Sequence, residues 1–503
     1  MSLLGIDIGT TGCKAIVFNI GGDEIASSYK EYSLIIPGDG SVEYNPDEVL
    51  ESVKDVIRNV NSHPGVAKDP VEAFSISVPG DEALPIDKNG KALYNMVCSL
   101  DSRGLKENAL INKKIGTSRL YDITGLPPSN MYALNRLLWF KNSKPSIYNG
   151  LYKFASWDSY IFKNFGLGCL SDYSVCSRTL AFDIVNKKWS SEILDSVDIP
   201  EEFFPECLPS GKVAGVLPGA ILDDLGFINK VYAVSGGFDQ ICAALGSGVT
   251  SAGIAAVGIG TVECMQVFVD KPITSYTMLK SNYPFSNHIL EDSYICLAIN
   301  FGGGSLLKWF RDNMAYEEKL EAEGRGIDIY KLFDEKAARS KNPLMVYPYF
   351  EGAQTPINDP LAKGVMAGFT LGTKKEDIIR GILEGITFEL KLNIDTLERN
   401  GIKIDSLNAS GGGSKSDFWL QLKADVTGKP IRSLKVNEAG CLAASIIAGY
   451  GIGKYNSISD AASRIIKIKK EYYPAVKNNE YYQQRFELYK KMYPLISKNV
   501  RKL

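Results

Sequence analysis

The chain has little of what several common enzyme classes need. Only two histidines, His63 and His288, occur among 503 residues, and neither lies in a recognisable catalytic setting. A Ser-His-Asp hydrolase or a histidine-ligated metalloenzyme would require one of them at its centre. Any general base is therefore expected to be a carboxylate, and both histidines are expected at the surface or in ordinary core positions.

Two nucleotide-binding signatures and the usual cysteine motifs are also missing. The Gly-Lys pairs at 90, 211, 428 and 453 are not followed by Ser or Thr, and no Gly-x-Gly-x-x-Gly occurs. The P-loop and dinucleotide-binding interpretations thereby lose their main support. Nine cysteines without a Cys-x-x-Cys pair indicate a reducing compartment, free thiols and no zinc site.

The chain has no excess of charge and no clear membrane segment. The 56 Lys and Arg residues against 58 Asp and Glu residues give a net charge of −2, which offers no basic field to a nucleic acid. The uncharged run 241–262 is rich in Gly, Ser and Thr, which favours a buried helix, a turn and a strand over a membrane span. With Asp7 arriving before any signal-like apolar region, we expect a cytoplasmic protein without nucleic-acid or membrane partners.

The first eighty residues predict an ordered set of elements. Strands are expected at 2–8 and 13–19 around a glycine turn, followed by a third strand at 24–29. Asn45 as cap and Pro46 at the first position predict a helix with an apolar face of valines and Ile57, and a strand follows at 73–78. The resulting β-β-β-α-β order mixes antiparallel and parallel neighbours.

The opening hairpin recurs halfway along the chain. Residues 256–261 can be laid over residues 5–10 at an offset of 251, with Ile-Gly-Thr identical in both copies. A repeat at half the chain length predicts two similar domains, 1–247 and 248–503, facing each other across a cleft. Only the first copy has an acid, because Gly258 stands where Asp7 would be.

The second half predicts a long helix and a glycine loop. A capping box from Thr373 to Glu376 opens a helix that ends near 400–401, and its Gly381 and Gly385 are expected to pack closely against another helix. A strand at 407–410, a glycine loop at 411–414 and a helix at 416–427 follow. Together they form a strand, glycine loop and helix unit.

Two segments have the residue types of phosphoryl-transfer chemistry. Asp7, Thr10, Thr11 and Lys14 place a carboxylate, two hydroxyls and a cation within eight residues, which suits a Mg²⁺-bound phosphate. A plain hairpin with an exposed lysine is the alternative. Asp239 follows a flexible glycine pair and is a candidate to accept a hydroxyl proton, with a helix N-cap as the alternative.

The ordered set of motifs resembles the FGGY family of carbohydrate kinases over nearly the whole chain, and segments 100–103, 347–352 and 364–370 are similar to xylulokinase-like members. The motifs are Asp-Ile-Gly-Thr-Thr from Asp7, Gly-Gly-Phe-Asp-Gln from Gly236, Gly-Ile-Gly-Thr from Gly258, Phe-Gly-Gly-Gly-Ser from Phe301, Gly-Gly-Gly-Ser-Lys-Ser-Asp-Phe-Trp from Gly411 and Glu-Ala-Gly-Cys-Leu-Ala-Ala from Glu438.

The resemblance implies an α/β fold: a duplicated ribonuclease-H-like, actin-like fold whose two lobes flank a catalytic cleft. The sugar would bind mainly to the N-terminal lobe and ATP to the C-terminal lobe, with Asp239 as general base and Asp7 helping to position Mg²⁺ through water. The residues implied for ATP are Gly9, Thr10, Thr11, Lys14, Gly260, Thr261, Gly303, Gly304, Gly412, Gly413 and Lys415, and those implied for the sugar are Gly80, Asp81, Asp101, Asp239 and Gln240.

The chain departs from the family where the sugar is recognised. Xylulokinases typically have Gln-Met-His-Gly after the strand that here ends at Val78, and glycerol kinases have Asn-Gln-Arg-Glu, but this chain has Pro-Gly-Asp-Glu. Asp81 falls where that His or Glu would sit, and its neighbour is Gly80, which either enlarges the pocket or leaves room for a side chain from elsewhere. Asp101, next to Arg103, is either a sugar contact or half of a structural ion pair.

The expected activity is transfer of the γ-phosphoryl group of ATP to a sugar or polyol hydroxyl. D-xylulose is one candidate among ketoses, polyols and sugar acids. An ATPase resembling actin or heat-shock proteins and a kinase-derived sugar sensor are the alternatives, although no helix-turn-helix segment supports the sensor. The oligomeric state stays open, a homodimer included.

Overall fold

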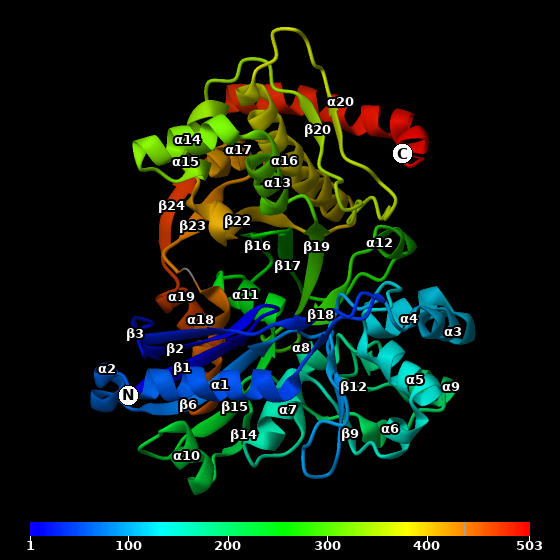
Figure 1. Ribbon diagram of the computed structural model, residues 1–503, viewed down its shortest axis with the longest axis vertical. Coiled ribbons are helices and arrows are strands. Elements are labelled where there is room, and N and C mark those ends of the chain that lie inside the picture. The colour runs from blue at the N-terminus through cyan, green and yellow to red at the C-terminus, as the bar shows by residue number, and fades with distance from the viewer. Residues whose placement is uncertain (437, 503) are drawn as a thin grey trace.

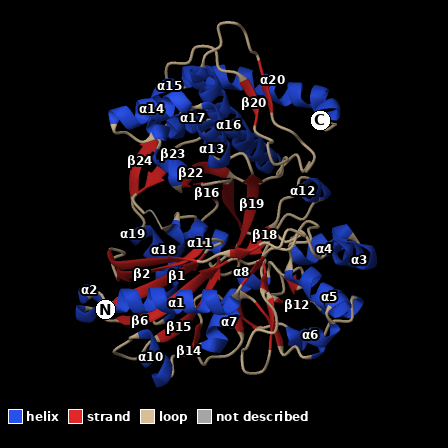
Figure 2. Ribbon diagram, viewed as in Figure 1, coloured by secondary structure: helices blue, strands red, loops and turns tan. Residues whose placement is uncertain are grey.

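The structure, a computed structural model, describes residues 1–436 and 438–502. It consists of two lobes stacked along the long axis of the molecule, each built around a twisted sheet with helices on its faces (Figures 1 and 2). The fold is the duplicated actin-like α/β fold that the sequence predicted.

The first sheet has six strands in the order β14-β15-β6-β1-β2-β3. Its three-stranded antiparallel meander is followed by α1 (Pro46–Asn61), and Asn45 caps this helix by accepting a hydrogen bond from the Asp47 amide at 3.1 Å. The predicted β-β-β-α-β order is therefore confirmed. The strands are β1 (Ser2–Ile8), β2 (Gly12–Asn19), β3 (Glu24–Glu31), β6 (Val71–Val78), β14 (Val213–Val216) and β15 (Tyr232–Phe238).

The second sheet repeats this order and adds one strand at an edge. Its parallel and antiparallel neighbours match those of the first sheet, with β16 and β17 in the places of β1 and β2. In the order β18-β19-β17-β16-β22-β23-β24, the strands are β18 (Phe285–Asn287), β19 (Tyr294–Asn300), β17 (Glu263–Val269), β16 (Gly253–Ile259), β22 (Ile404–Ser410), β23 (Ile431–Leu434) and β24 (Ile468–Tyr472).

Two helices lie between the sheets (Figure 1). They are α11 (Asp239–Gly246) and α18 (Ala439–Gly451), and they pack against each other. Although α18 lies between β23 and β24 of the second sheet in sequence, it covers β1, β6 and β15 of the first sheet. Gly5 permits this contact, since a Cβ there would lie 1.8 Å from the carbonyl oxygen of Cys441. A helix from the second half of the chain thus completes the hydrophobic core of the first lobe.

The long insertion between β6 and β14 extends the first lobe sideways (Figure 1). Its polar loops and short helices surround the carboxyl ends of β6 and β15. It contains β7 (Leu84–Ile86), β8 (Met96–Val97), α3 (Leu105–Ile115), α4 (Thr117–Thr124), α5 (Ala133–Ser143), α6 (Pro145–Asn149), β9 (Lys153–Ala155), α7 (Trp157–Asn164), β10 (Leu170–Asp172), α8 (Tyr173–Cys176), β11 (Phe182–Asp183), β12 (Lys188–Trp189), α9 (Ser191–Ser196) and β13 (Glu206–Leu208).

The second lobe is covered by long helices, and here two sequence predictions were wrong in detail. The long helix α16 begins at Lys375, one residue after the predicted start, because Thr373 Oγ1 accepts from the Thr370 amide and Asp377 caps the Lys374 amide at 2.9 Å. Gly381 and Gly385 pack closely, but against a strand rather than a helix. The elements are α13 (Gly304–Met314), α14 (Tyr316–Arg325), α15 (Ile329–Ala337), β20 (Met345–Tyr347), β21 (Val365–Ala367), α16 (Lys375–Arg399), α17 (Asp417–Thr427) and α20 (Val476–Val500), while α19 (Ile458–Ile465) packs against α18.

The uncharged run, the cysteines and the two histidines noted in the sequence all have ordinary structural positions. Residues 241–262 form most of α11, a turn, the buried strand β16 and the turn after it, and no helix in the described residues could span a bilayer. All nine cysteines are free thiols. His63 caps the short helix α2 (Pro64–Lys68), and burial lowers the pKa of His288 to about 4. Both histidines therefore have structural positions.

Candidate active site

Asp239 is the first residue of α11, directly after β15. The strand passes close to β6 at Gly236, where a Cβ would lie 1.9 Å from the Ile76 carbonyl oxygen, so only glycine allows this approach. Phe238, not Asp239, holds the N-cap position. The Asp239 carboxylate is not used as a cap, and its Oδ1 is buried without a hydrogen-bond partner among the described residues.

The surroundings of Asp239 make its carboxylate a better base than an ordinary aspartate. Burial raises the pKa of Asp239 well above its usual value, and the charges of Asp7, Asp81 and Glu82 raise it further. Cys264 on β17 also lies within electrostatic reach, because Asp239 contributes to the raised pKa of that thiol. Asp239 therefore sits where elements of the two lobes approach each other.

Asp81 is paired with Arg178, a residue that sequence reasoning missed. Its Oδ1 accepts a hydrogen bond from Arg178 Nε at 3.0 Å and forms an ion pair with Arg178 Nη2 at 2.9 Å. A Cβ on Gly80 would lie 2.6 Å from Arg178 Cγ, so the arginine stem fills the space beside that glycine. Gly80 therefore does not enlarge the pocket. The space beside it is filled by a side chain from elsewhere in the lobe, which was the second of the two alternatives. No local motif marks Arg178, which lies 97 residues from its partner.

Asp101 and Gln240, both predicted to bind the sugar, are engaged by protein groups. Asp101 accepts from Arg103 Nη2 at 2.5 Å and from the Val42 amide at 2.7 Å, which matches the structural ion pair considered above. Gln240 Oε1 accepts from Gln266 Nε2 at 2.9 Å and so links α11 to β17. Their sugar contacts remain predictions.

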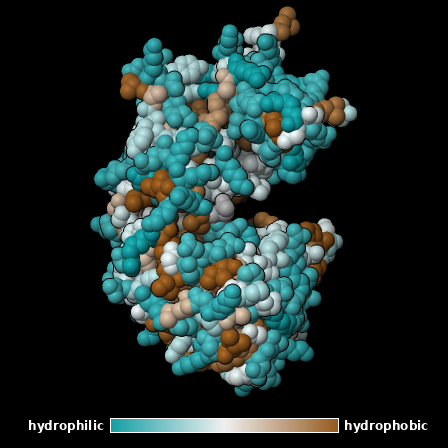
Figure 3. All heavy atoms as spheres, turned by 90° about the vertical axis from the view of Figure 1, so that its left-hand side faces the viewer, coloured by the Kyte–Doolittle hydropathy of each residue, from teal (hydrophilic) through white to brown (hydrophobic). Residues whose placement is uncertain are grey.

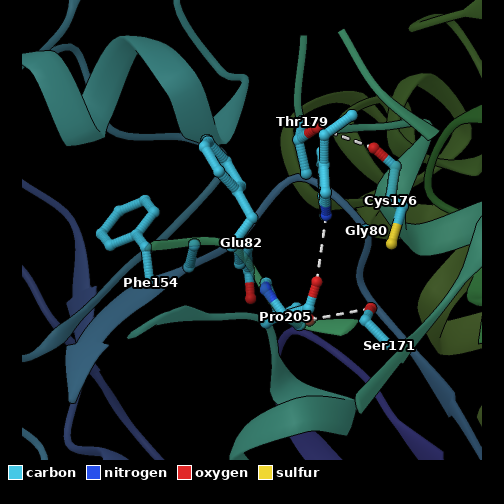
Figure 4. A pocket seen from close by; sticks show the side chains of 12 residues that line it. Gly80, Glu82, Phe154, Ser171, Cys176, Thr179 and Pro205 are labelled. Atoms are coloured by element: carbon cyan, nitrogen blue, oxygen red, sulfur yellow. Dashed lines mark hydrogen bonds between the residues drawn. The ribbon is translucent and has the colours of Figure 1, made fainter. Parts of the chain in front are cut away.

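Glu82, next to Asp81, is a buried carboxylate that the sequence did not single out. It accepts hydrogen bonds from Trp157 Nε1 at 2.8 Å, Tyr44 Oη at 3.2 Å and the Ser99 amide at 3.3 Å. It also lines a cavity of about 10 Å³ together with Gly80 and Thr179 (Figure 4). Such a space holds one water at most, so the sugar must bind outside it.

The first hairpin brings Asp7 and Lys14 to the start of α18. Lys14 Nζ pairs with Glu438 Oε1 at 2.5 Å, while Thr10 and Thr11 are exposed in the turn. Burial raises the pKa of Asp7, and the charge of Glu438 adds to this. A Cβ on Gly440 would lie 2.8 Å from Asp7 Oδ1, so glycine leaves that oxygen uncovered.

The second hairpin has a turn one residue shorter and is fixed to α13. The amides of Gly304 and Ser305 donate to the carbonyl oxygens of Gly260 at 2.8 Å and Thr261 at 2.9 Å. Gly303 is needed for this contact, because a Cβ there would lie 2.6 Å from the Val262 carbonyl carbon. Turn and helix therefore form one rigid unit.

That unit borders a pocket of about 1370 Å³ in the second lobe. Trp309, Phe333 and Phe418 give it apolar walls, and Asp334, whose pKa burial raises to about 6, adds an acceptor near Ser416 that sequence reasoning missed. Of the residues predicted for ATP, those that line it are Gly260, Thr261, Gly304, Gly412, Gly413 and Lys415. Gly303 does not line the pocket but contacts the turn that does. The first hairpin lies outside the pocket.

A deep notch separates the two lobes when the molecule is viewed from the side (Figure 3). The large pocket belongs to the upper lobe, and the carboxylates around Asp239 belong to the lower lobe and to α11. No group of three or more His, Cys, Asp or Glu residues in the described part of the chain is arranged to hold a metal on its own.

Comparison with known proteins agrees with this arrangement. The model of the FGGY family of carbohydrate kinases, N-terminal domain, matches residues 2–246, and that of the C-terminal domain matches residues 255–452. The chain is 27% identical to the xylulose kinase of Bacillus subtilis over 98% of this chain and 96% of the relative. It is 28% identical to the gluconokinase of the same organism, over 92% and 90% of the two chains.

Solved structures share the fold. The ligand-bound xylulose kinase from Lactobacillus acidophilus superposes with a TM-score of 0.89 at 24% identity, covering 100% of this chain and 99% of that one. The Plasmodium falciparum glycerol kinase with ADP gives a TM-score of 0.86 at 20% identity, covering 97% of each chain. With both family domains matched in order along its length, the chain belongs to the FGGY family of carbohydrate kinases and is a phosphotransferase.

Proposed function

We propose that the protein transfers the γ-phosphoryl group of ATP to a hydroxyl of a sugar, sugar acid or polyol, with D-xylulose as one candidate. The observation that carries the proposal is the buried, unpartnered Oδ1 of Asp239 at the junction of the lobes. The similarity of the chain to a xylulose kinase, a gluconokinase and a glycerol kinase supports a small polyhydroxyl acceptor.

In this proposal Asp239 accepts the proton of the attacking hydroxyl. The hydroxyl oxygen forms the new bond to phosphorus as the bond to the ADP oxygen breaks. The raised pKa of Asp239 suits this task, because an aspartate with the usual pKa would bind the proton too weakly. General-base assistance of this kind contributes about 10²–10⁴-fold to the rate, and positioning and charge neutralisation supply the rest.

Asp7 fits a Mg²⁺ that is mostly liganded by phosphate and water. It offers one uncovered carboxylate oxygen beside Gly440, and Mg²⁺ commonly takes only one or two protein carboxylates in phosphoryl-transfer sites. When bound, the ion neutralises charge on the terminal phosphates. We assign Thr10, Thr11 and Lys14 to the same phosphates, with Lys14 leaving Glu438 to reach them.

Phosphoryl transfer requires the lobes to approach each other. We assign the sugar to residues 1–247 and the nucleotide to residues 248–503, apart from α18, which packs on the first sheet. The pocket is lined by the second lobe, whereas Asp239 follows β15 of the first sheet, so closure of the lobes would bring γ-phosphate and hydroxyl together. It would also exclude water that would otherwise hydrolyse ATP.

A coupled assay of ADP release tests the proposal. The purified protein is screened with Mg-ATP against pentuloses, hexuloses, pentitols, tetritols and aldonic acids. We expect at least one to stimulate ADP release far above the ATP-only background. If none does, the protein is better explained as an ATP-driven conformational machine or a sugar sensor.

A further inference from the structure

The Arg178–Asp81 pair has hydrogen-bonding capacity left over. Both arginine contacts converge on Asp81 Oδ1, and Asp81 Oδ2 makes no hydrogen bond to the described residues. Arg178 Nη1 is buried and also lacks a partner. The guanidinium lies 5.1 Å from the Phe238 ring centroid and 5.3 Å from that of Tyr132, which holds it in place.

Negative charge dominates the surroundings of this pair. Asp7, Asp81 and Glu82 all lie close enough to Asp239 to raise its pKa. Arg178 is the cation facing Asp81 and Asp239, and it is already bonded to Asp81. The single positive charge of Arg178, already paired with Asp81, does not neutralise this set of carboxylates.

The other cations near these carboxylates are paired or out of reach of a substrate. Arg136 forms no ion pair with the described residues and donates from Nη1 to the Cys98 carbonyl oxygen at 2.5 Å, but it is fully buried. Arg103 bridges Asp101 and Glu43, and Lys14 pairs with Glu438. A carboxylate on an incoming sugar would therefore lose its hydration and meet like charges, with no accessible unpaired cation among these residues, which is costly in a partly buried site.

We propose that the Arg178–Asp81 pair selects neutral polyhydroxyl substrates against sugar acids. Asp81 Oδ2 accepts a hydrogen bond from one substrate hydroxyl while Asp239 faces the hydroxyl that reacts. Arg178 is a positioning residue that holds Asp81 and occupies the space beside Gly80. This inference rests on the proposed function and narrows it to ketoses and polyols.

The first experiment compares neutral and acidic substrates of equal chain length, namely D-xylulose and xylitol with D-xylonate, and D-fructose and sorbitol with D-gluconate. We expect kcat/KM for the better neutral compound to exceed that for the acid by about 100-fold or more, the scale of rejection expected for an unpaired buried charge. Equal or higher kcat/KM for an acid overturns the inference and leaves the kinase function standing. No turnover with either class overturns the proposed function itself.

The second experiment alters the pair. Asp81→Asn is expected to raise KM for the neutral sugar about 10-fold and to reduce the neutral-to-acid ratio by a similar factor, because it removes one negative charge and leaves Arg178 unpaired. KM for ATP should not change. An unchanged ratio overturns the inference. Arg119→Ala is the matched control, since it breaks an exposed ion pair with Glu192 on the surface of the same lobe.

A double-mutant cycle separates positioning from simple stability. If Arg178 acts through Asp81, Arg178→Ala alone should lower kcat/KM for the neutral sugar by about 10-fold or more. In the Asp81→Asn background the same substitution should lower it much less. Arg178→Lys should restore part of the loss. Fully additive losses overturn the positioning role. If Arg178→Ala does not fold, the neutral-to-acid ratios of kcat/KM in the parent and in Asp81→Asn still decide the inference.

Discussion

The two sides of the notch are built differently. On the sugar side, buried carboxylates stand close together, two of their oxygens have no partner, and the cavity beside Gly80 measures only about 10 Å³. On the nucleotide side, glycines allow backbone segments to touch and leave a pocket of about 1370 Å³. The first side is organised for charge and proton transfer, and the second for a large ligand. Substitutions on the sugar side should therefore lower kcat or raise KM for the sugar, and those on the nucleotide side should raise KM for ATP.

The largest expected effect is that of Asp239→Asn. Because the amide cannot accept the hydroxyl proton, kcat should fall by about 10³-fold or more, within or beyond the usual range for loss of a general base. ATP binding, measured by calorimetry, should persist. Turnover close to that of the parent would remove Asp239 from its role.

The same variant has a second signature in stability. A carboxyl whose pKa is raised in the folded state has a stability cost that is absent below the usual pKa of aspartate and grows as the pH rises towards the raised value. Asp239→Asn should therefore unfold at the same or a higher temperature than the parent at pH 8, and this advantage should fade as the pH falls towards the usual pKa of aspartate. A lower unfolding temperature at pH 8 would indicate that Asp239 is structural.

Next in size is Asp7→Asn on the same side of the notch. Losing the charge that orients the cation should reduce kcat about 10²-fold and raise the Mg²⁺ concentration needed for half-maximal rate. The titration is done at saturating ATP, with the circular dichroism spectrum as the check on folding. An unchanged Mg²⁺ dependence would contradict the assigned role of Asp7.

Gly413→Ala tests the nucleotide side and should have a smaller effect. A Cβ there would lie 2.3 Å from Ile259 Cγ2, so the loop must shift, and KM for ATP should rise about 10-fold with little change in kcat at saturation. Gly412→Ala, where the added Cβ meets nothing within 4 Å, should have a much weaker effect. A fall in kcat alone would break the distinction between the two sides.

The smallest effect is expected far from the notch. Glu389 is buried and accepts hydrogen bonds from the hydroxyls of Tyr349 at 2.6 Å and of Tyr489, and burial raises its pKa to about 7. Because its ionised form is the costly one, Glu389→Gln should stabilise the protein at pH 8 by up to about 3 kcal/mol and have little effect below pH 4. Kinetic constants should not change. Stabilisation that is equal at both pH values would show that proton linkage is not the cause.

Local patterns in the sequence predicted much of the fold. The cap at Asn45, the two hairpins and the strand, glycine loop and helix unit ending at Gly428 all formed, because turn chemistry and apolar periodicity act within a few residues. The long helix α16 started one residue late because Thr373 had a competing partner in the preceding turn.

What the sequence could not predict depends on contacts between distant residues. The packing of α18 on β1 joins segments more than 400 residues apart in sequence, and the Arg178–Asp81 pair joins two loops of the first lobe. Glu82 and Asp334 resemble surface acids until the fold buries them. Asp239 stood out because its glycine pair marks it locally, whereas its missing hydrogen-bond partner is visible only in three dimensions.

The most direct test of the account is the pH dependence of sugar-stimulated ADP release in the parent and in Asp239→Asn. We predict that kcat/KM of the parent falls on the acid side with a pKa clearly above the usual 3.8 of aspartate, and that the residual activity of the variant lacks this limb. The same acid limb in both proteins would place the general base elsewhere and contradict the account.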